Sequence, residues 1–198
     1  DVVSPVAIAW DADGRLFVAE MSDYPVGPAG GRVKLLEDRD GDGRYERVSV
    51  FADRLKFPNG VMPWRGGVLV TAAPEILFLK DNDGDGVADE RRVIFTGFGE
   101  GNLQLRVNGL HWGLDNWIYG ANGRSDGEVR RTAEAQDLIA ADVKRLEARR
   151  AESGADSRRL LQEAAPSNAP VSLRAHDFRF DPRTLKFEAI AGRSQFGA

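Results

Sequence analysis

The sequence of 198 residues predicts an all-β protein, and three observations support this prediction. Short apolar runs of strand-like composition recur along the chain, each bounded by a turn dipeptide such as Asp-Gly, Gly-Gly or Asp-Asn. Two acidic loops, EDRDGDGRYE and KDNDGDGVADE, have their first aspartates at Asp38 and Asp81. Similar apolar runs flank both loops. The repeating unit is therefore four short strands in about 45 residues, which is the size of a β-propeller blade.

An antiparallel sandwich also contains short, evenly spaced strands, but it does not predict the same acidic loop at the same place in consecutive units. We therefore predict a partial β-propeller of about three four-stranded blades in one domain over residues 1–198. The blades are expected at residues 4–52, at 58–97, and at 107–131 completed by 174–191. Closed propellers have about four to eight blades, so the remaining blades are expected outside this chain.

Each blade is predicted from its own hairpins. In the first, SPVAIAWDADGRLFVAE turns at Asp-Gly, and RVKLLED and ERVSVFAD flank the first acidic loop. In the second, PNGVMPWRGGVLVTAAPE turns at Gly-Gly, and EILFLKD and ERRVIFTG flank the second loop. The third begins with VNGLHWGLDNWIYGANG and resumes with AHDFRFDP and LKFEAIAG, joined by a turn at residues 181–184.

A helical insertion is predicted over residues 132–165, inside the third blade. TAEAQDLIAADVKRLEARR places apolar residues at helical spacing, with charged residues at most other positions. Thr132 is the expected N-cap, and Glu134 lies in the positively polarised first turn. A shorter helical piece is expected around residues 160–161. The insertion is expected to pack on the outside of the propeller, and a partner-binding helix is the alternative.

The acidic loops are candidate calcium sites, because alternating carboxylates repel one another until a cation neutralises them. An EF-hand is excluded: position 12 would be Ser49 or Arg92 instead of glutamate, and the flanks are strands. The alternative interpretation is a pair of solvated turns, since Asp and Gly are good turn formers. The candidate metal ligands are Asp38, Asp40, Asp42 and Glu46 in the first loop and Asp81, Asp83, Asp85 and Asp89 in the second.

Side chains suited to chemistry are densest between Arg106 and Gly123. Asn59-Gly60 and Asn108-Gly109 begin corresponding strands, which in a propeller lie beside the central channel, and their amides could bind a sugar hydroxyl or a quinone carbonyl. His111 is the candidate general base. The candidate cofactor-binding residues are Asn59, Asn108, Trp112 and Asn122. The structural alternatives are tight-turn geometry for Asn-Gly, a hydrogen-bonded strand residue for His111, and packing between blades for Trp112 and Trp117.

Composition excludes several classes of protein. A net charge of −4 and a pI near 5.3 do not provide the basic face that nucleic acids or anionic membranes require. No run of 18 apolar residues is present, so no transmembrane segment is expected in this chain. The chain has no cysteine, which excludes disulfides, thiol catalysis and covalently attached haem c within it.

PVAIAWDADGRLFVAEMSDYP, GRVKLLEDRDGDGRYERVSVFAD, NGLHWGLDNWIYGANG and HDFRFDP together resemble the N-terminal propeller of the large membrane-bound dehydrogenases of planctomycete-type bacteria. That propeller is similar to the glucose/sorbosone dehydrogenases. The resemblance covers nearly the whole chain except the helical insertion. It implies a periplasmic or cell-envelope location, a sugar or alcohol substrate, pyrroloquinoline quinone (PQQ), calcium, and a cytochrome c domain outside this chain. The related dehydrogenases have a catalytic histidine just before an Asn-Gly pair, where this sequence has Val107.

Two function classes therefore stay open. In the first, the chain is part of an exported quinoprotein-like dehydrogenase that passes electrons to a haem domain outside this chain. In the second, it is a non-catalytic carbohydrate-binding or assembly propeller with structural calcium. His111 with its aromatic and amide neighbours favours the first class, and Val107 favours the second. In either case, 198 residues alone are expected to be inactive, because sites in this fold draw on several blades.

Overall fold

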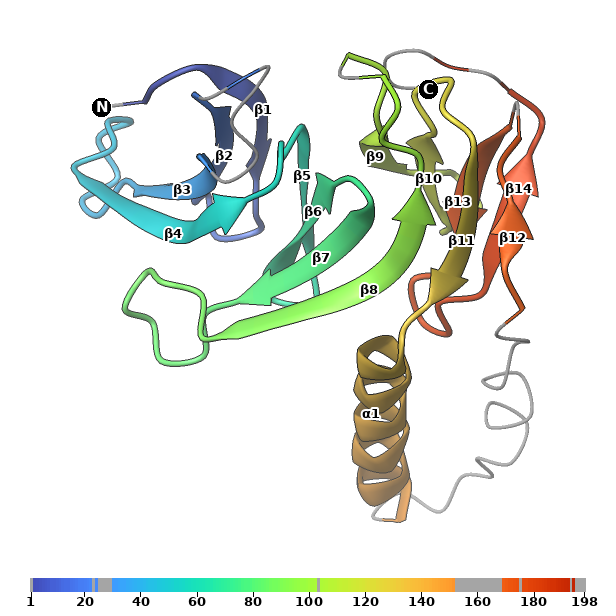
Figure 1. Ribbon diagram of the computed structural model, residues 1–198. Coiled ribbons are helices and arrows are strands. Elements are labelled where there is room, and N and C mark those ends of the chain that lie inside the picture. Colours follow the sequence, from blue (N-terminus) through green and yellow to red (C-terminus); the bar gives the residue numbers. More distant parts are fainter. Residues whose placement is uncertain are drawn as a thin grey trace.

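The chain folds into three antiparallel sheets and one long helix, shown in Figure 1 for the computed structural model. The structure describes residues 2–22, 24, 30–102, 104–151, 169–174, 176–192 and 194. Within these ranges, no helix is long and apolar enough to cross a membrane.

The first sheet pairs consecutive strands in the order β1-β2-β3-β4. Its strands are β1 (Pro5–Trp10), β2 (Leu16–Met21), β3 (Gly31–Glu37) and β4 (Arg47–Leu55). The predicted Asp-Gly turn joins β1 to β2, and the Asp11 carboxylate accepts the backbone N–H groups of Asp13 and Arg15 at 3.0 and 2.9 Å. Gly14 supplies the positive φ of 77° that the turn needs.

The second sheet repeats this arrangement with β5 (Gly60–Trp64), β6 (Gly67–Ala72), β7 (Glu75–Lys80) and β8 (Glu90–Phe98). The two acidic loops connect β3 to β4 and β7 to β8 (Figure 1). Asp38 and Asp81 each follow the last residue of the preceding strand, so they occupy the same place in consecutive sheets. This finding confirms the repeat that the sequence predicts.

The third sheet has the order β14-β13-β10-β9. It contains β9 (Asn108–Trp112), β10 (Ile118–Ala121), β13 (Asp177–Phe180) and β14 (Phe187–Ile190). The predicted turn at residues 181–184 joins β13 to β14, and the Leu185 N–H donates to the Asp181 carbonyl oxygen across it at 2.8 Å. Two stretches far apart in the sequence therefore complete one blade, as predicted.

The structure corrects the expected extent of the third blade at residues 127–131. This segment forms β11 (Gly127–Arg131), which pairs with β8 and, with β12 (Val171–Ser172), extends the second sheet to six strands. The physical reason is that β8 has an unpaired outer edge, whereas β13 already occupies the edge of β10.

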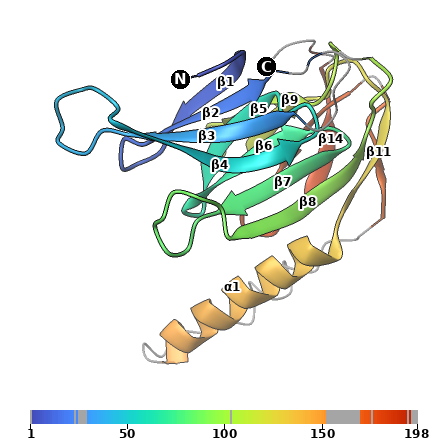
Figure 2. The same cartoon turned by 60° about the vertical axis from the view of Figure 1, so that its left-hand side comes forward.

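The helical insertion begins where the sequence predicts. The helix α1 covers Ala133–Ala151, and the Ala135 N–H donates to the Thr132 hydroxyl oxygen at 3.2 Å, which confirms the N-cap. Ile139 is buried in the core, and Leu138 and Val143 pack against it. Figure 2 shows α1 beside the outer strand β8. The expected helical piece around residues 160–161 lies outside the described residues.

Apolar layers hold the sheets together face to face. One layer between the first and second sheets includes Phe17, Leu35 and Val70. The other joins the second and third sheets with the helix and includes Phe95 and Phe178. The first strand of the second sheet, β5, lies beside both β1 and β9, so the innermost strands of all three sheets are neighbours. This is a partial propeller-like β fold with a helical insertion.

Candidate functional site

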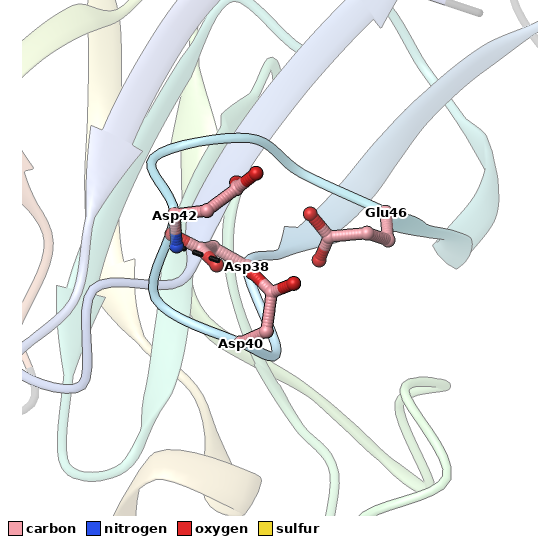
Figure 3. Close-up of side chains that lie close together, drawn as sticks. All are labelled: Asp38, Asp40, Asp42 and Glu46. Atoms are coloured by element: carbon pink, nitrogen blue, oxygen red, sulfur yellow. Dashed lines mark hydrogen bonds between the residues drawn. The ribbon is translucent and has the colours of Figure 1, made fainter.

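The first acidic loop gathers the four carboxylates that the sequence predicts. Asp38, Asp40, Asp42 and Glu46 each place one carboxylate oxygen within 4.8 Å of the others (Figure 3). The Asp38 carboxylate is fixed by the N–H groups of Gly41 and Gly43, at 2.7 and 2.9 Å. The side chains are mostly exposed. This arrangement could hold a metal ion, because carboxylate oxygens are the ligands that hard cations prefer.

The second loop brings together Asp81, Asp83 and Asp89, but not Asp85. The Asp85 carboxylate accepts the Val87 N–H at 2.8 Å. Burial acts to raise the pKa of Asp81, but the backbone N–H groups of Gly86, Gly84 and Asp83 donate to its carboxylate and outweigh burial. Its pKa therefore lies below the ordinary value, and the group stays ionised at neutral pH.

The second loop also rests against the first sheet. The Ser49 hydroxyl donates to the Gly86 carbonyl oxygen at 2.9 Å, and the Arg47 guanidinium donates to the Asp85 carbonyl oxygen. Ser49 would be position 12 of an EF-hand loop, and this contact binds it to the neighbouring loop. The second loop therefore connects adjacent sheets, so a cation in this loop would act on the packing of β4 against the second sheet.

A pocket of about 950 Å³ lies where the innermost strands of the three sheets begin. Its described lining is uncharged and consists of Ser4, Pro5, Val6, Ala7, Ile8, Met21, Ser22, Tyr24, Asn59, Gly60, Val61, Gln104, Asn108, Gly109 and Leu110. We call it the inner-strand pocket. It contains both asparagines that the sequence places at equivalent strand starts.

The two asparagines are held by different contacts. The Asn59 carboxamide oxygen accepts the Thr71 hydroxyl at 2.9 Å, and the carboxamide nitrogen of Asn59 donates to none of the described residues. The Asn108 carboxamide nitrogen donates to the Arg106 carbonyl oxygen at 2.7 Å. Asn59 therefore offers a donor to a ligand in the pocket, such as a hydroxyl or carbonyl oxygen.

His111 does not line the inner-strand pocket. It lies at the other end of β9, in a shallow pocket of about 500 Å³ with Trp112, Leu114, Asp115 and Tyr119. Its Nδ1 lies 3.0 Å from the Gly109 carbonyl oxygen, and its ring stacks on Tyr119 at 5.8 Å between centroids. Because a carbonyl oxygen only accepts, Nδ1 carries the hydrogen, and in the neutral ring Nε2 is then the basic nitrogen.

The remaining predicted cofactor-binding residues lie apart from the inner-strand pocket. Trp112 is 52% exposed and lines a second pocket with residues from the turns of all three sheets, among them Asp13, Gly66 and Pro182. Asn122 is buried, and its carboxamide nitrogen donates to the carbonyl oxygens of Ser125 and, at 3.1 Å, Leu173. These contacts give Asn122 a structural position between β10 and the chain leading to β13.

The candidate residues predicted from the sequence do not include Tyr24, Gln104 or Arg106, although the first two line the inner-strand pocket. Arg106 lies just outside the lining and is 4% exposed. A signal was present for Arg106, because it stands two residues before Asn108 and strand alternation places such residues on one side. No local sequence signal predicts that Tyr24 lies at the pocket, because Tyr24 follows β2 of the first sheet and is far in sequence from Asn59 and Asn108.

Comparisons with known proteins identify a family and two similar structures. A family model described as "Domain of unknown function (DUF7133)" matches residues 1–159. No curated protein is significantly similar to the chain in sequence. The chain is similar to the iodide structure and the calcium structure of the Trichoderma reesei Carbohydrate-Active Enzymes Family AA12, with TM-scores of 0.47 and 0.44 and 15% identity to each. The matches cover 68% and 70% of this chain and 37% of each solved chain. The chain thus spans well under two thirds of the length of these structures.

Proposed function

This chain belongs to the DUF7133 family, and we propose that it is part of the propeller of an exported, dehydrogenase-like oxidoreductase that oxidises a sugar or another alcohol. The observation that supports this proposal is the inner-strand pocket. Asn59 and Asn108, at the starts of corresponding strands in neighbouring sheets, both line it. Polar groups that converge on a largely apolar pocket of this size are typical of small-molecule sites.

The chemistry requires an electron acceptor. Oxidation of an alcohol removes a hydride from carbon and a proton from oxygen, and PQQ would accept the two electrons when bound. The quinone is a tricarboxylate, whereas the described lining of the inner-strand pocket has no charged side chain. These residues alone do not complete a quinone site, so its cationic partners are expected on further blades. The electrons would then leave through a cytochrome c domain outside this chain.

Further blades are the partners that we propose for this chain. The outer face of the first sheet exposes Val6, Ile8 and Trp10 by 46%, 52% and 55%. The opposite face of the same sheet packs on the second sheet. We therefore propose that another blade of the parent propeller covers this outer face. The location of the parent protein is proposed to be the periplasm or cell envelope.

We propose that His111 is a proton acceptor, but only for a substrate that binds in the shallow pocket. Its Nε2 can take a proton only from a substrate in the shallow pocket beside Asp115 and Tyr119, because the inner-strand pocket lies at the other end of β9. A ligand in the inner-strand pocket needs its proton acceptor on another blade.

The second candidate function is a carbohydrate-binding or assembly propeller. The exposed Trp112 beside His111 and Tyr119 favours it, because exposed aromatic rings provide flat apolar faces for sugar rings. In this case the catalytic step is absent and calcium is purely structural.

Reconstitution of the full-length protein with PQQ and calcium, followed by a dye-reduction assay over a panel of sugars, tests the first proposal. We expect sugar-dependent dye reduction, with Asn59→Ala and Asn108→Ala each raising KM by about tenfold, the effect of losing one hydrogen bond. Gln136→Ala, an exposed amide on α1, is the matched control. No dye reduction and no change in quinone absorbance would support the binding propeller instead.

Calcium in the acidic loops is expected to stabilise the fold. We predict that chelation lowers the melting temperature of the wild type, by the equivalent of about 2.7 kcal/mol per site when calcium stands at 100 times its Kd. Asp40→Ala combined with Asp83→Ala should abolish this response, because both loops lose a ligand. Asp13→Ala, an exposed aspartate in the β1–β2 turn, should keep it. A chelator-independent wild type would identify the loops as plain turns.

A further inference from the structure

Arg106 is a buried cation whose side chain has no hydrogen-bonding partner among the described residues. Its side chain is 4% exposed, and its Nε and Nη1 are buried without an acceptor. Its guanidinium lies 4.1 Å from the centroid of the Phe57 ring, which contributes a cation–π contact but no hydrogen bond. Burial lowers the pKa of Arg106, an effect that the charges of Glu100 and Tyr24 only partly oppose.

The surroundings of Arg106 do not neutralise it. Glu100 is close enough to raise the pKa of Arg106, but the Glu100 carboxylate is hydrogen-bonded to Lys56. Among the described residues, Arg106 makes no ion pair. A buried charge without a partner destabilises a folded protein, because its lost hydration is not replaced. An anion that reached the guanidinium would remove this penalty.

Arg106 is a neighbour of the inner-strand pocket, although it is not part of the described lining. Its carbonyl oxygen accepts the Asn108 carboxamide, and its charge interacts with Tyr24; both residues line the pocket. No acidic side chain occurs in the described lining. Among the described residues, the pocket lining is thus uncharged and the neighbouring guanidinium has no anionic partner, so the pocket should favour anionic ligands over neutral ones of the same shape.

We propose that the inner-strand pocket binds a sugar that carries a carboxylate, such as a uronic acid, and that Arg106 binds this carboxylate. The proposal rests on the proposed function only in that the ligand is a sugar. Asn59 would hydrogen-bond a ring hydroxyl, while the planar guanidinium matches the planar carboxylate. Gln104, two residues before Arg106, is exposed and lines the pocket.

Isothermal titration of the full-length protein with D-glucuronate, D-glucose and acetate tests this proposal. We expect D-glucuronate to bind at least about tenfold more tightly than D-glucose, since a charge-assisted hydrogen bond is worth roughly that factor, and acetate to bind too weakly to detect. Arg106→Met keeps the contact with Phe57 and should reduce the preference for D-glucuronate to none. Arg130→Met, at an exposed position of β11, should leave the preference unchanged.

A melting curve without ligand separates binding from a structural role. Since the Arg106 side chain has no hydrogen bond or ion pair to lose within the described part of the chain, Arg106→Met should melt at the same temperature as the wild type or higher. A lower melting temperature would show that the guanidinium supports the fold, and it would overturn the proposal.

The remaining outcomes are also distinguishable. Equal binding of D-glucose and D-glucuronate would overturn the inference and leave the proposed sugar site intact. Binding of neither sugar would remove the sugar site as well. Binding of PQQ that depends on Arg106, without binding of D-glucuronate, would assign the guanidinium to the cofactor and overturn the inference.

Discussion

Replacing Phe95 with alanine is expected to lower the free energy of unfolding by about 3–5 kcal/mol. Phe95 lies on β8 with no solvent exposure, and its ring contacts Phe180 and Phe187 at centroid distances of 5.0 and 4.9 Å. It therefore fills the layer between the second and third sheets. Removal of the ring leaves a cavity where the two sheets meet, and the side chains around it relax only partly. Urea unfolding followed by tryptophan fluorescence measures the loss.

Two further variants make this test specific. Phe95→Leu keeps most of the volume and should cost about 1–2 kcal/mol. Val87→Ala, in the second acidic loop where Val87 is 46% exposed, should change stability by less than about 0.5 kcal/mol. A Phe95→Ala variant as stable as Val87→Ala would contradict the face-to-face packing of these sheets.

Replacing Glu20 with alanine is expected to cost about 3–5 kcal/mol, the usual cost of breaking a buried ion pair from one side. The Glu20 side chain has no solvent exposure on β2. Its carboxylate accepts the Val3 N–H at 2.7 Å, forms an ion pair with Arg32 and lies 3.5 Å from the Lys34 ammonium. Without Glu20, the buried Lys34 ammonium loses its carboxylate. Chemical unfolding of the variant measures the effect.

The double variant Glu20→Leu with Lys34→Met is the control. Replacing both members of a buried ion pair with apolar residues of similar size is often neutral, so this variant should recover most of the lost stability. If Glu20→Ala alone is as stable as the wild type, the outer face of the first sheet does not contain a buried charge cluster.

The repeat could be predicted from the sequence because it depends on turn residues and apolar runs that are neighbours in the chain. The two acidic loops connect β3 to β4 and β7 to β8, and the same aspartate and glycine pattern begins at Asp38 and at Asp81. The cap at Thr132 likewise depends only on residues within one helical turn. Such features need no knowledge of distant contacts.

The candidate site could be predicted only in part. Asn59 and Asn108 share a pocket, because equivalent strand starts converge in this fold. His111 lies elsewhere, although it is only three residues from Asn108. In a regular strand an odd separation places two side chains on opposite faces, and a register shift in the pairing of β9 with β10 adds to the difference.

The amino-acid sequence by itself determined the elements that neighbouring residues create: the hairpin turns, the acidic loops, the start of α1 and the all-β class. The tertiary structure alone decided that Gly127–Arg131 joins β8 instead of completing the third blade, and that Arg106 lies buried beside the inner-strand pocket. The physical reason is the same in both cases. Which strand edge is unpaired, and which charge loses its water, depend on residues far apart in the chain.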